Sequence, residues 1–164
     1  MHIQIYVTGE GETVGRWLSL PMHPDELRMA MHEIADGNEA LEIRDFEAPF
    51  IIERDDDVFT VNEAAAVMAQ YDDQLVYALC GCTDNADQVI RILNGGQFRV
   101  YYDVDNLYDV ADAMVRAGLY GRVPVALRRF LDYDKMVRAL ADAGWHFHPE
   151  VRVAVQPLYA MDAD

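Results

Sequence analysis

Two residue types, lysine and cysteine, are nearly missing from this sequence, and the scarcity of cysteine excludes two kinds of structural site. Lysine occurs once, at Lys135, among 13 basic residues. Cysteine occurs twice, at Cys80 and Cys82, which is too close for an ordinary structural disulfide and too few thiols for a zinc site. We therefore expect a reduced protein without a disulfide framework, as is usual in the cytoplasm.

Long hydrophobic runs are also missing. No stretch approaches the roughly 18 to 20 apolar residues that a membrane-spanning helix needs. Residues 1–10 lack the basic and apolar regions of a signal peptide, so we expect a cytoplasmic protein with no membrane contact. Apolar residues still make up 52% of the chain, which is enough for a hydrophobic core and argues against disorder.

Negative charge is what the sequence has in excess. It carries 29 acidic and 13 basic residues, a formal net charge of −16. Residues 25–112 hold 21 of the acids and five of the cations, and so account for the whole net charge, whereas residues 113–164 are close to neutral. Direct binding to nucleic acid is disfavoured because it needs clustered cations. Adaptation to high salt would act on every exposed surface, so the uneven distribution favours a localised function.

The N-terminal part predicts a small sheet with one helix. Apolar residues alternate over residues 3–7 and 41–44, which is the period-two pattern of strands. Residues 16–20, ended by Pro21, predict a further strand. Pro24 opens a helix with an apolar face, and Gly37 stops it.

The middle part predicts a compact helical unit. The polar segment 53–57 marks its boundary, and Thr60 with Glu63 has the spacing of a capping box. Asp84 is the expected cap of the last helix in this unit. A unit of about 40 residues is small for independent stability, so we expect it to pack on its neighbours. The expected helices cover residues 61–70, 74–80 and 86–94.

The C-terminal part predicts a further mixture of helices and strands. Asp105 or Asn106 caps its first long helix, and Asp132 caps its second. Together the three parts predict an α+β chain of three small domains, with bounds 1–60, 61–103 and 104–164. The expected elements are a strand at 98–102, a helix at 107–117, a helical turn at 124–131, a helix at 133–143 and a strand at 151–155.

Motifs for catalysis or for cofactor binding are not recognisable. The glycines near the N-terminus lack phosphate-loop spacing, and residues 103–107 break the pattern of a calcium loop. His146 and His148 would share one face of a strand and could bind a metal, but no third ligand is apparent. No serine or cysteine has a recognisable nucleophile setting, and 29 carboxylates form too many accidental pairs for any one to indicate a hydrolase. We therefore expect no cofactor.

The distribution of carboxylates favours imitation of DNA. Duplex DNA carries about one negative charge per 1.7 Å of axis, so the 21 acids of residues 25–112 match the phosphates of roughly 10 base pairs. Helix caps and outer helix faces hold carboxylates more rigidly than a flexible acidic tail does. The candidate phosphate-mimicking residues are Asp25, Glu26, Glu33, Asp36, Glu42, Asp45, Glu47, Glu53, Asp55, Asp56, Asp57, Asp72, Asp73, Asp84, Asp87, Asp103, Asp105, Asp109 and Asp112.

Several segments of the sequence match a known family. In the N-terminal part these segments are residues 5–7, 15–21 (GRWLSLP) and 42–50 (EIRDFEAPF). In the C-terminal part they are residues 106–111 (NLYDVA) and 118–140. Together they resemble the ArdA antirestriction proteins of plasmids, phages and conjugative transposons, and the two C-terminal segments cover the antirestriction motif of that family.

The resemblance implies an elongated, curved homodimer of three-domain chains whose carboxylates imitate bent B-form DNA. Proteins of this family occupy the DNA groove of type I restriction-modification enzymes, chiefly on the methyltransferase core formed by specificity and modification subunits. The resemblance also implies no catalytic activity, no cofactor and dimerisation through the C-terminal domain.

The near-neutral charge of the C-terminal part agrees with a dimer contact there, because two copies can approach with little repulsion. A symmetric two-fold contact is the commonest arrangement. The other possibility is that the apolar residues of this segment fill the core of their own domain. The candidate contact residues are Val125, Leu127, Arg128, Arg129, Phe130 and Leu131.

Two other functions stay open at this point. One is an acidic adaptor for a different basic DNA-binding protein. The other is an enzyme for a small ligand, which predicts one concave pocket with perturbed titratable groups.

Overall fold

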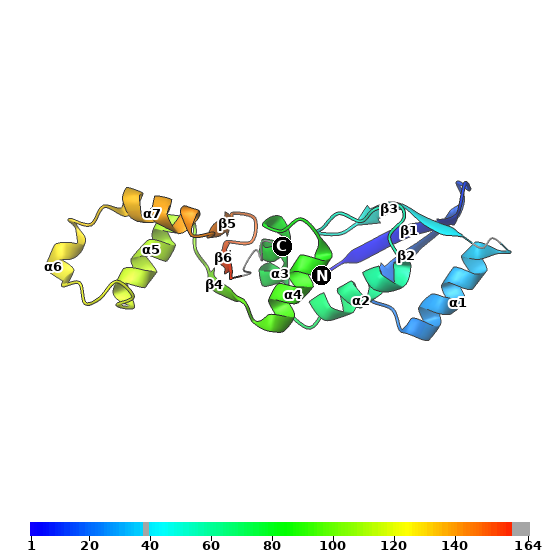
Figure 1. The fold of residues 1–164 in the computed structure, drawn as a ribbon, viewed down its shortest axis with the longest axis horizontal. Coiled ribbons are helices and arrows are strands. Elements are labelled where there is room, and N and C mark those ends of the chain that lie inside the picture. The colour runs from blue at the N-terminus through cyan, green and yellow to red at the C-terminus, as the bar shows by residue number, and fades with distance from the viewer. Residues whose placement is uncertain (38–39, 159–164) are drawn as a thin grey trace, which may run out of the picture.

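A computed structural model describes residues 1–37 and 40–158, and within these ranges the chain is a mixture of helices and antiparallel sheets. Seven helices and two three-stranded sheets are present in the described residues, which confirms the α+β class. The elements follow the long axis of the molecule, with α6 (Val125–Arg128) at one end and α1 (Pro24–Ala35) at the other (Figure 1). No helix in the described ranges is both long and apolar enough to cross a membrane.

The first sheet has the order β2-β1-β3, with β1 (Ile3–Gly9) paired antiparallel to β2 (Gly15–Leu20) and β3 (Leu41–Glu47). The inward side chains of β1 alternate as the sequence predicts, and Ile3, Ile5 and Val7 are buried. Helix α1 contacts β1 and buries its own Leu27 and Ala30. The predicted strands and helix of this part are confirmed, and β3 continues to residue 47.

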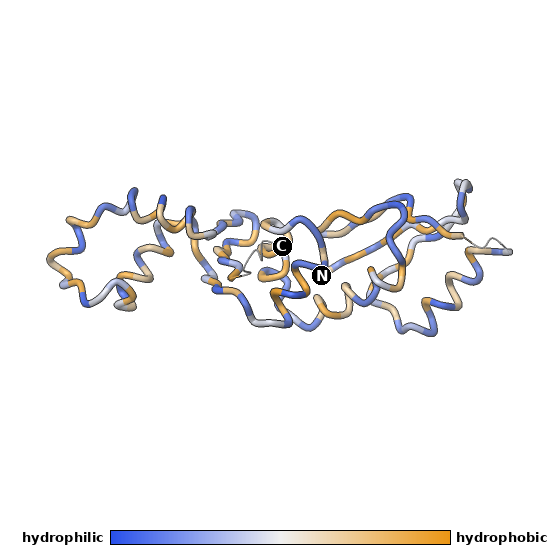
Figure 2. The backbone as a smooth tube through the Cα atoms, viewed as in Figure 1, coloured by the Kyte–Doolittle hydropathy of each residue, from blue (hydrophilic) through white to orange (hydrophobic). Residues whose placement is uncertain are grey.

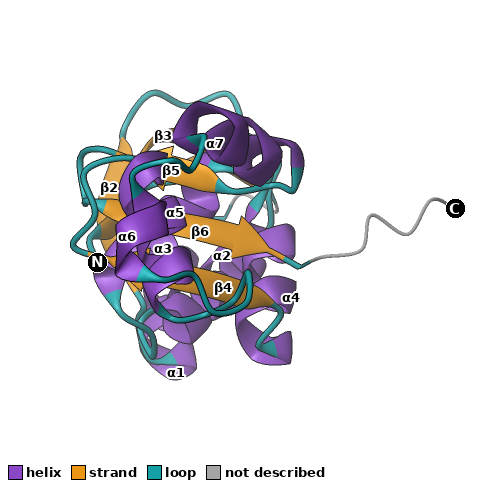
Figure 3. Ribbon diagram, turned by 90° about the vertical axis from the view of Figure 1, so that its left-hand side faces the viewer, coloured by secondary structure: helices purple, strands orange, loops and turns teal. Residues whose placement is uncertain are grey.

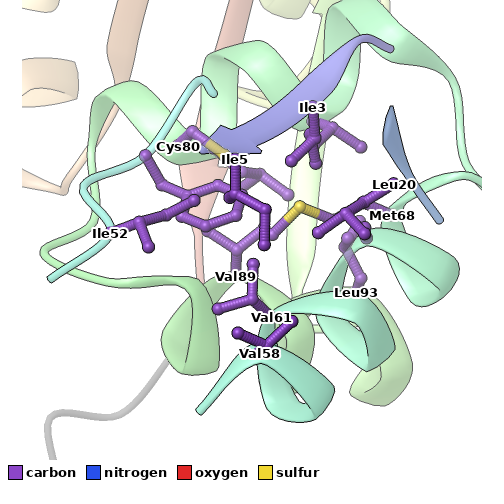
Figure 4. Packing of buried hydrophobic residues seen from close by; sticks show 14 of the residues in the cluster. Ile3, Ile5, Leu20, Ile52, Val58, Val61, Met68, Cys80, Val89 and Leu93 are labelled. Carbon is purple, nitrogen blue, oxygen red and sulfur yellow. The ribbon is translucent and has the colours of Figure 1, made fainter. Parts of the chain in front are cut away.

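Three helices, α2 (Val58–Met68), α3 (Asp73–Gly81) and α4 (Ala86–Gly95), form the middle of the chain. They share one hydrophobic cluster with the first sheet, as the small size of this unit predicts. Figure 4 shows Val58 and Val61 of α2 beside Val89 of α4 in this cluster, with Ile3 and Ile5 of β1 nearby.

Two of the predicted helix caps in this region are wrong. Helix α2 begins earlier than the capping box predicts, because the Asp57 side chain accepts a hydrogen bond from the Thr60 amide at 3.0 Å. The earlier start buries Val58 against the core. Helix α4 is capped by Asn85 rather than Asp84, since the Asn85 amide oxygen accepts from the Gln88 amide at 3.0 Å. Asp, Asn and Thr are all acceptable caps, so residue preference alone does not select Asp57 over Thr60 or Asn85 over Asp84.

The second sheet has the order β4-β6-β5 and places its central strand between two hydrophobic clusters. Its strands are β4 (Phe98–Tyr102), β5 (His146–His148) and β6 (Val153–Pro157). Val153 and Val155 of β6 belong to the large cluster, whereas Ala154 belongs to a second, smaller cluster. This follows from the period-two geometry of a strand, whose successive side chains point to opposite faces.

Helix α3 packs closely on the second sheet at its last residue, Gly81. A Cβ atom at Gly81 would lie 2.1 Å from the Cε1 atom of His148 on β5. The missing side chain therefore lets the imidazole lie against the end of α3.

Helices α5 (Leu107–Arg116) and α7 (Tyr133–Asp142) pack on each other over the second cluster. That cluster includes Val110 and Met114 of α5 and Leu140 of α7. Asn106 caps α5 and Asp132 caps α7, as the sequence predicts. Figure 3 views the molecule along its long axis from this end, with α5, α6 and α7 toward the viewer.

Candidate partner-binding surface

Nearly all of the candidate carboxylates lie on the surface. Among the candidate phosphate-mimicking residues, only Glu42 and Asp112 are partly covered, and the others are exposed. The acids come from helix starts, from outer helix faces and from the loops between elements. The surface they form is therefore carried by folded elements rather than by a tail.

Helix caps fix two of these carboxylates to the backbone. Asp57 Oδ2 accepts hydrogen bonds from both the amide and the hydroxyl of Thr60, at 3.0 and 2.9 Å. Asp72 Oδ1 accepts from the amides of Gln74 and Leu75 at the start of α3, at 3.0 and 3.3 Å. A negative charge at a helix N-terminus is also stabilised by the helix dipole.

The loop before α2 holds a dense group of acids in a defined turn. Asp56 Oδ2 accepts a hydrogen bond from the Glu53 amide at 2.8 Å, and the Asp56 amide donates to the Glu53 carbonyl at 3.2 Å. These two bonds close the turn and leave the Asp55 and Glu53 carboxylates exposed to solvent.

Three aspartates form a stripe along α5 and the turn that precedes it. The Asp105 amide donates to Asp109 Oδ2 at 2.8 Å, and the Asp109 amide donates to Asn106 Oδ1 at 3.0 Å. These two bonds form a capping arrangement, similar to a capping box, that orders the start of the helix. Asp112 continues the stripe one turn later and pairs with Arg116 at 2.9 Å.

Arginines neutralise one carboxylate almost completely. Glu42, whose side chain is only 12% exposed, contacts the guanidinium groups of Arg54 and Arg44, both at 2.8 Å. The hydrogen bond from Arg54 is the main cause that lowers the pKa of Glu42 to about 2. This carboxylate therefore presents little net charge to a partner.

Other candidate acids lie beside one or two basic groups. Glu33 pairs with Arg16 at 2.9 Å, and Asp25 pairs with Arg28 at 3.1 Å. Asp73 binds the amino group of Met1 at 2.7 Å. Arg152 contacts Asp105 at 3.0 Å and Asp103 at 4.0 Å. The arginine pairs are about half exposed or more on both sides, so solvent screens them, whereas the Met1 side chain beside Asp73 is covered.

The remaining candidates divide into two groups. Asp45 accepts a hydrogen bond from the adjacent Phe46 amide, and Glu47 lies 4.0 Å from the His2 imidazole. Several other carboxylates have no hydrogen-bond or ion-pair partner within residues 1–37 and 40–158, and so present their full charge to solvent. These are Glu26, Asp36, Glu53, Asp55, Asp84 and Asp87.

The segment proposed for a dimer contact does not fill the core of its own domain. Val125, Leu127 and Phe130 are 76%, 52% and 70% exposed, and α6 has no buried residue. Arg129 lies over the Phe130 ring, 4.9 Å from its centroid. Figure 2 shows hydrophobic residues along α6 at the outer end of the molecule.

The rest of this segment is partly covered, and two neighbours extend it. Arg128 and Leu131 are half-buried, and Arg128 Nε is buried without a hydrogen bond in the described residues. Leu119 and Tyr120 are also exposed, although the sequence analysis did not single them out. Two apolar residues between Gly118 and Gly121 were the available signal. We call Leu119, Tyr120, Val125, Leu127 and Phe130 the α6 surface.

Cysteine and histidine chemistry is limited in this fold. Burial raises the pKa of Cys80 to about 12 and of Cys82 to about 11, so both thiols stay protonated and are poor nucleophiles at neutral pH. His146 and His148 lie on β5, as predicted. No group of three metal-binding side chains occurs in the described part of the chain.

The comparison with protein families gives one match. The model of the antirestriction protein (ArdA) family matches residues 6–148. The matched range includes both sheets in part and all of α1 to α7. No curated protein matches the chain.

Proposed function

This chain belongs to the ArdA antirestriction family, and from that premise we propose that it is a DNA mimic that inhibits type I restriction-modification enzymes. Its carboxylates occupy the DNA groove of the methyltransferase core that the specificity and modification subunits form. The family is one of inhibitors rather than of known enzymes, and the proposed action needs neither catalysis nor a cofactor. The partner acts on DNA, so the proposed location is the cytoplasm.

The observation that carries this proposal is the combination of exposure and rigidity in the acids. A DNA groove is complementary to phosphates at fixed positions, and a flexible tail would lose conformational entropy on entering it. Here Asp57 and Asp72 are held by helix amides, and Asp109 is held by the capping pair of α5. The carboxylates are thus ordered before the partner arrives.

Charge density explains why several elements must act together. Asp109 and Asp112 are three residues apart on α5, which is about 4.5 Å at the helix rise of 1.5 Å per residue. Duplex DNA has about one charge per 1.7 Å. One helical stripe therefore supplies less than half of the density of a duplex, and the acids of the caps, loops and other helices supply the rest.

We further propose an elongated homodimer of three-domain chains, joined through the C-terminal domain. The α6 surface supports this, because its apolar side chains lie exposed at one end of the molecule, away from most of the acids. A symmetric contact there doubles the length of the carboxylate array with little repulsion. The contact residues proposed are Val125, Leu127, Arg128, Arg129, Phe130 and Leu131.

A pull-down tests the proposed function. Purified type I methyltransferase should be retained by the immobilised protein, and excess duplex DNA should release it. Retention that duplex DNA does not affect would indicate an adaptor that binds elsewhere on a basic partner. No retention would contradict the proposal.

A further inference from the structure

A small hollow opens between the starts of α2 and α4, and it combines apolar walls with an acidic rim. Its volume is about 170 Å³. Phe50, Ile51 and Ala64 form apolar wall, and its rim includes Asp56, Asp57 and Asp87. We call this hollow the α2–α4 slot.

The rim offers hydrogen-bond acceptors that the fold does not use. Oδ2 of Asp57 accepts hydrogen bonds from Thr60, and Oδ2 of Asp56 accepts one from the Glu53 amide. Oδ1 of each carboxylate stays available to a ligand. Asp87 has no hydrogen-bond or ion-pair partner in the described ranges. Each helix start contributes about +0.5 charge, so the three carboxylates outweigh the two helix ends and the slot attracts cations.

The wall offers apolar contact beside these acceptors. Ile51 is 67% exposed although it adjoins the core residues Phe50 and Ile52. Because Ile51 also lines the slot, its exposed side chain offers apolar surface against which the methylene stem of a long basic side chain can lie. The volume is close to that of the roughly 150 Å³ cavity known to admit benzene, so a flat group of similar size fits.

We propose that the slot receives an arginine side chain from the basic groove of the restriction-modification enzyme. A guanidinium is flat, carries five donors and is weakly hydrated, so it can bind two or three carboxylates while its stem lies on Ile51. A lysine ammonium is compact and strongly hydrated, and it matches the slot less well. This inference rests on the proposed function for the identity of the partner, but the slot itself can be tested without it.

The first experiment uses no enzyme. N-acetyl-arginine methylamide is titrated into the labelled protein, and amide chemical shifts are followed by NMR. We expect saturable shifts at Ile51, Ala64 and Asp87, larger than those given by N-acetyl-lysine methylamide. Shifts spread evenly over the acidic surface, or equal shifts with the lysine compound, would overturn the proposal.

Substitutions that fill the slot or remove its charge provide the second experiment. Thr60→Phe places a ring in the slot without changing the charge, and Asn94→Phe, at the exposed far end of α4, is its control. Asp87→Asn removes one charge from the rim. Its control, Asp36→Asn, removes an equally unpaired charge outside the slot, at a left-handed residue where asparagine is tolerated.

Affinity for the methyltransferase distinguishes the variants. We expect Thr60→Phe and Asp87→Asn to weaken binding by about 10-fold or more, as a central contact does. The two controls should weaken it by less than about 5-fold, as a screened surface charge does. Equal effects of Asp87→Asn and Asp36→Asn would overturn the proposal that the slot binds an arginine, but they would not contradict the proposed carboxylate array. If the unaltered protein does not bind the enzyme, the proposed function fails, and the arginine titration still decides the slot.

Discussion

The Tyr133 hydroxyl on α7 donates a hydrogen bond to the Asp112 carboxylate on α5, at 3.1 Å. Tyr108 on α5 donates in return to Asp134 on α7. Partial burial and the bond to Asp112 raise the pKa of Tyr133, and the bond to Asp134 raises the pKa of Tyr108. Two of the acids in this region therefore join helices, in addition to any role toward a partner.

The Tyr133 bond predicts a measurable loss of stability. Tyr133→Phe should lower the free energy of unfolding by about 1 kcal/mol, the usual net contribution of one hydrogen bond. Asp112 keeps its contact with Arg116 and stays partly exposed, so no buried unsatisfied group is created. Urea unfolding measures the change. Tyr77→Phe is the control, because the Tyr77 hydroxyl has no hydrogen bond within the described residues, and an equal loss there would contradict the assignment.

The Glu42 ion pairs predict a stability difference that depends on pH. The pKa of Glu42 falls from 4.5 to about 2 on folding, so its carboxylate stabilises the fold above pH 4.5. That stabilisation is lost as the pH falls from 4.5 toward 2. Glu42→Gln should therefore lower the melting temperature at pH 7, with a difference from the unaltered protein that shrinks below pH 4.5.

Glu47→Gln is the matched control for this measurement, since Glu47 lies on the same strand and is exposed. If the difference in melting temperature between Glu42→Gln and the unaltered protein stays constant from pH 7 to pH 3, Arg44 and Arg54 do not stabilise the ionised Glu42 carboxylate as described. Inhibition should change little in Glu42→Gln, because the carboxylate is mostly covered.

The proposed array predicts that acids act collectively. Asp109→Asn should weaken inhibition of the restriction enzyme by less than about 5-fold, since a screened surface charge contributes about 1 kcal/mol or less. Joint replacement of Glu53 by Gln and of Asp55, Asp56 and Asp57 by Asn should weaken it by about 10-fold or more. Asparagine also caps helices, so α2 should still form.

The control for the joint variant removes charges outside the acid-rich region, by Asp142→Asn with Glu150→Gln. Inhibition by this control should stay close to that of the unaltered protein. A single substitution such as Asp109→Asn that abolishes inhibition in a folded protein would contradict the array and indicate a discrete site.

The α6 surface predicts a dimer that one charge can break. Phe130→Glu should give folded monomers at micromolar concentration, because it places a carboxylate in the proposed apolar contact. Met29→Glu on α1 is the control, since Met29 is 66% exposed at the other end of the molecule. Sedimentation velocity measures both variants. A monomer in the unaltered protein, or a dimer that survives Phe130→Glu, would contradict the contact.

Much of the fold could be predicted because its elements have clear local signals. The alternation of Ile3, Ile5 and Val7 predicted β1, and Pro24 with Gly37 framed α1. The caps of α2 and α4 could not be fixed, because Asp57 and Thr60, like Asp84 and Asn85, are all acceptable caps. Burial of Val58 selects Asp57 over Thr60, and the hydrogen bond from the Gln88 amide selects Asn85 over Asp84.

Prediction of the candidate surface was limited by the same kind of ambiguity. Charge counts identified the acid-rich region, but they could not tell that Arg44 and Arg54, from different segments, converge on Glu42. The α2–α4 slot likewise depends on segments that are distant in sequence, such as Asp56 and Asp87. The three-domain division and the dimer stay predictions.

The most direct measurement of the central claim is displacement of a fluorescent duplex from purified type I methyltransferase. The protein should release the duplex completely, and its affinity should fall at least about 10-fold as salt rises from about 50 to 200 mM, since exposed charge pairs are screened. The joint variant of Glu53, Asp55, Asp56 and Asp57 should displace the duplex less well at every salt concentration. A ternary complex that retains the duplex, or binding that is independent of salt, would contradict the claim.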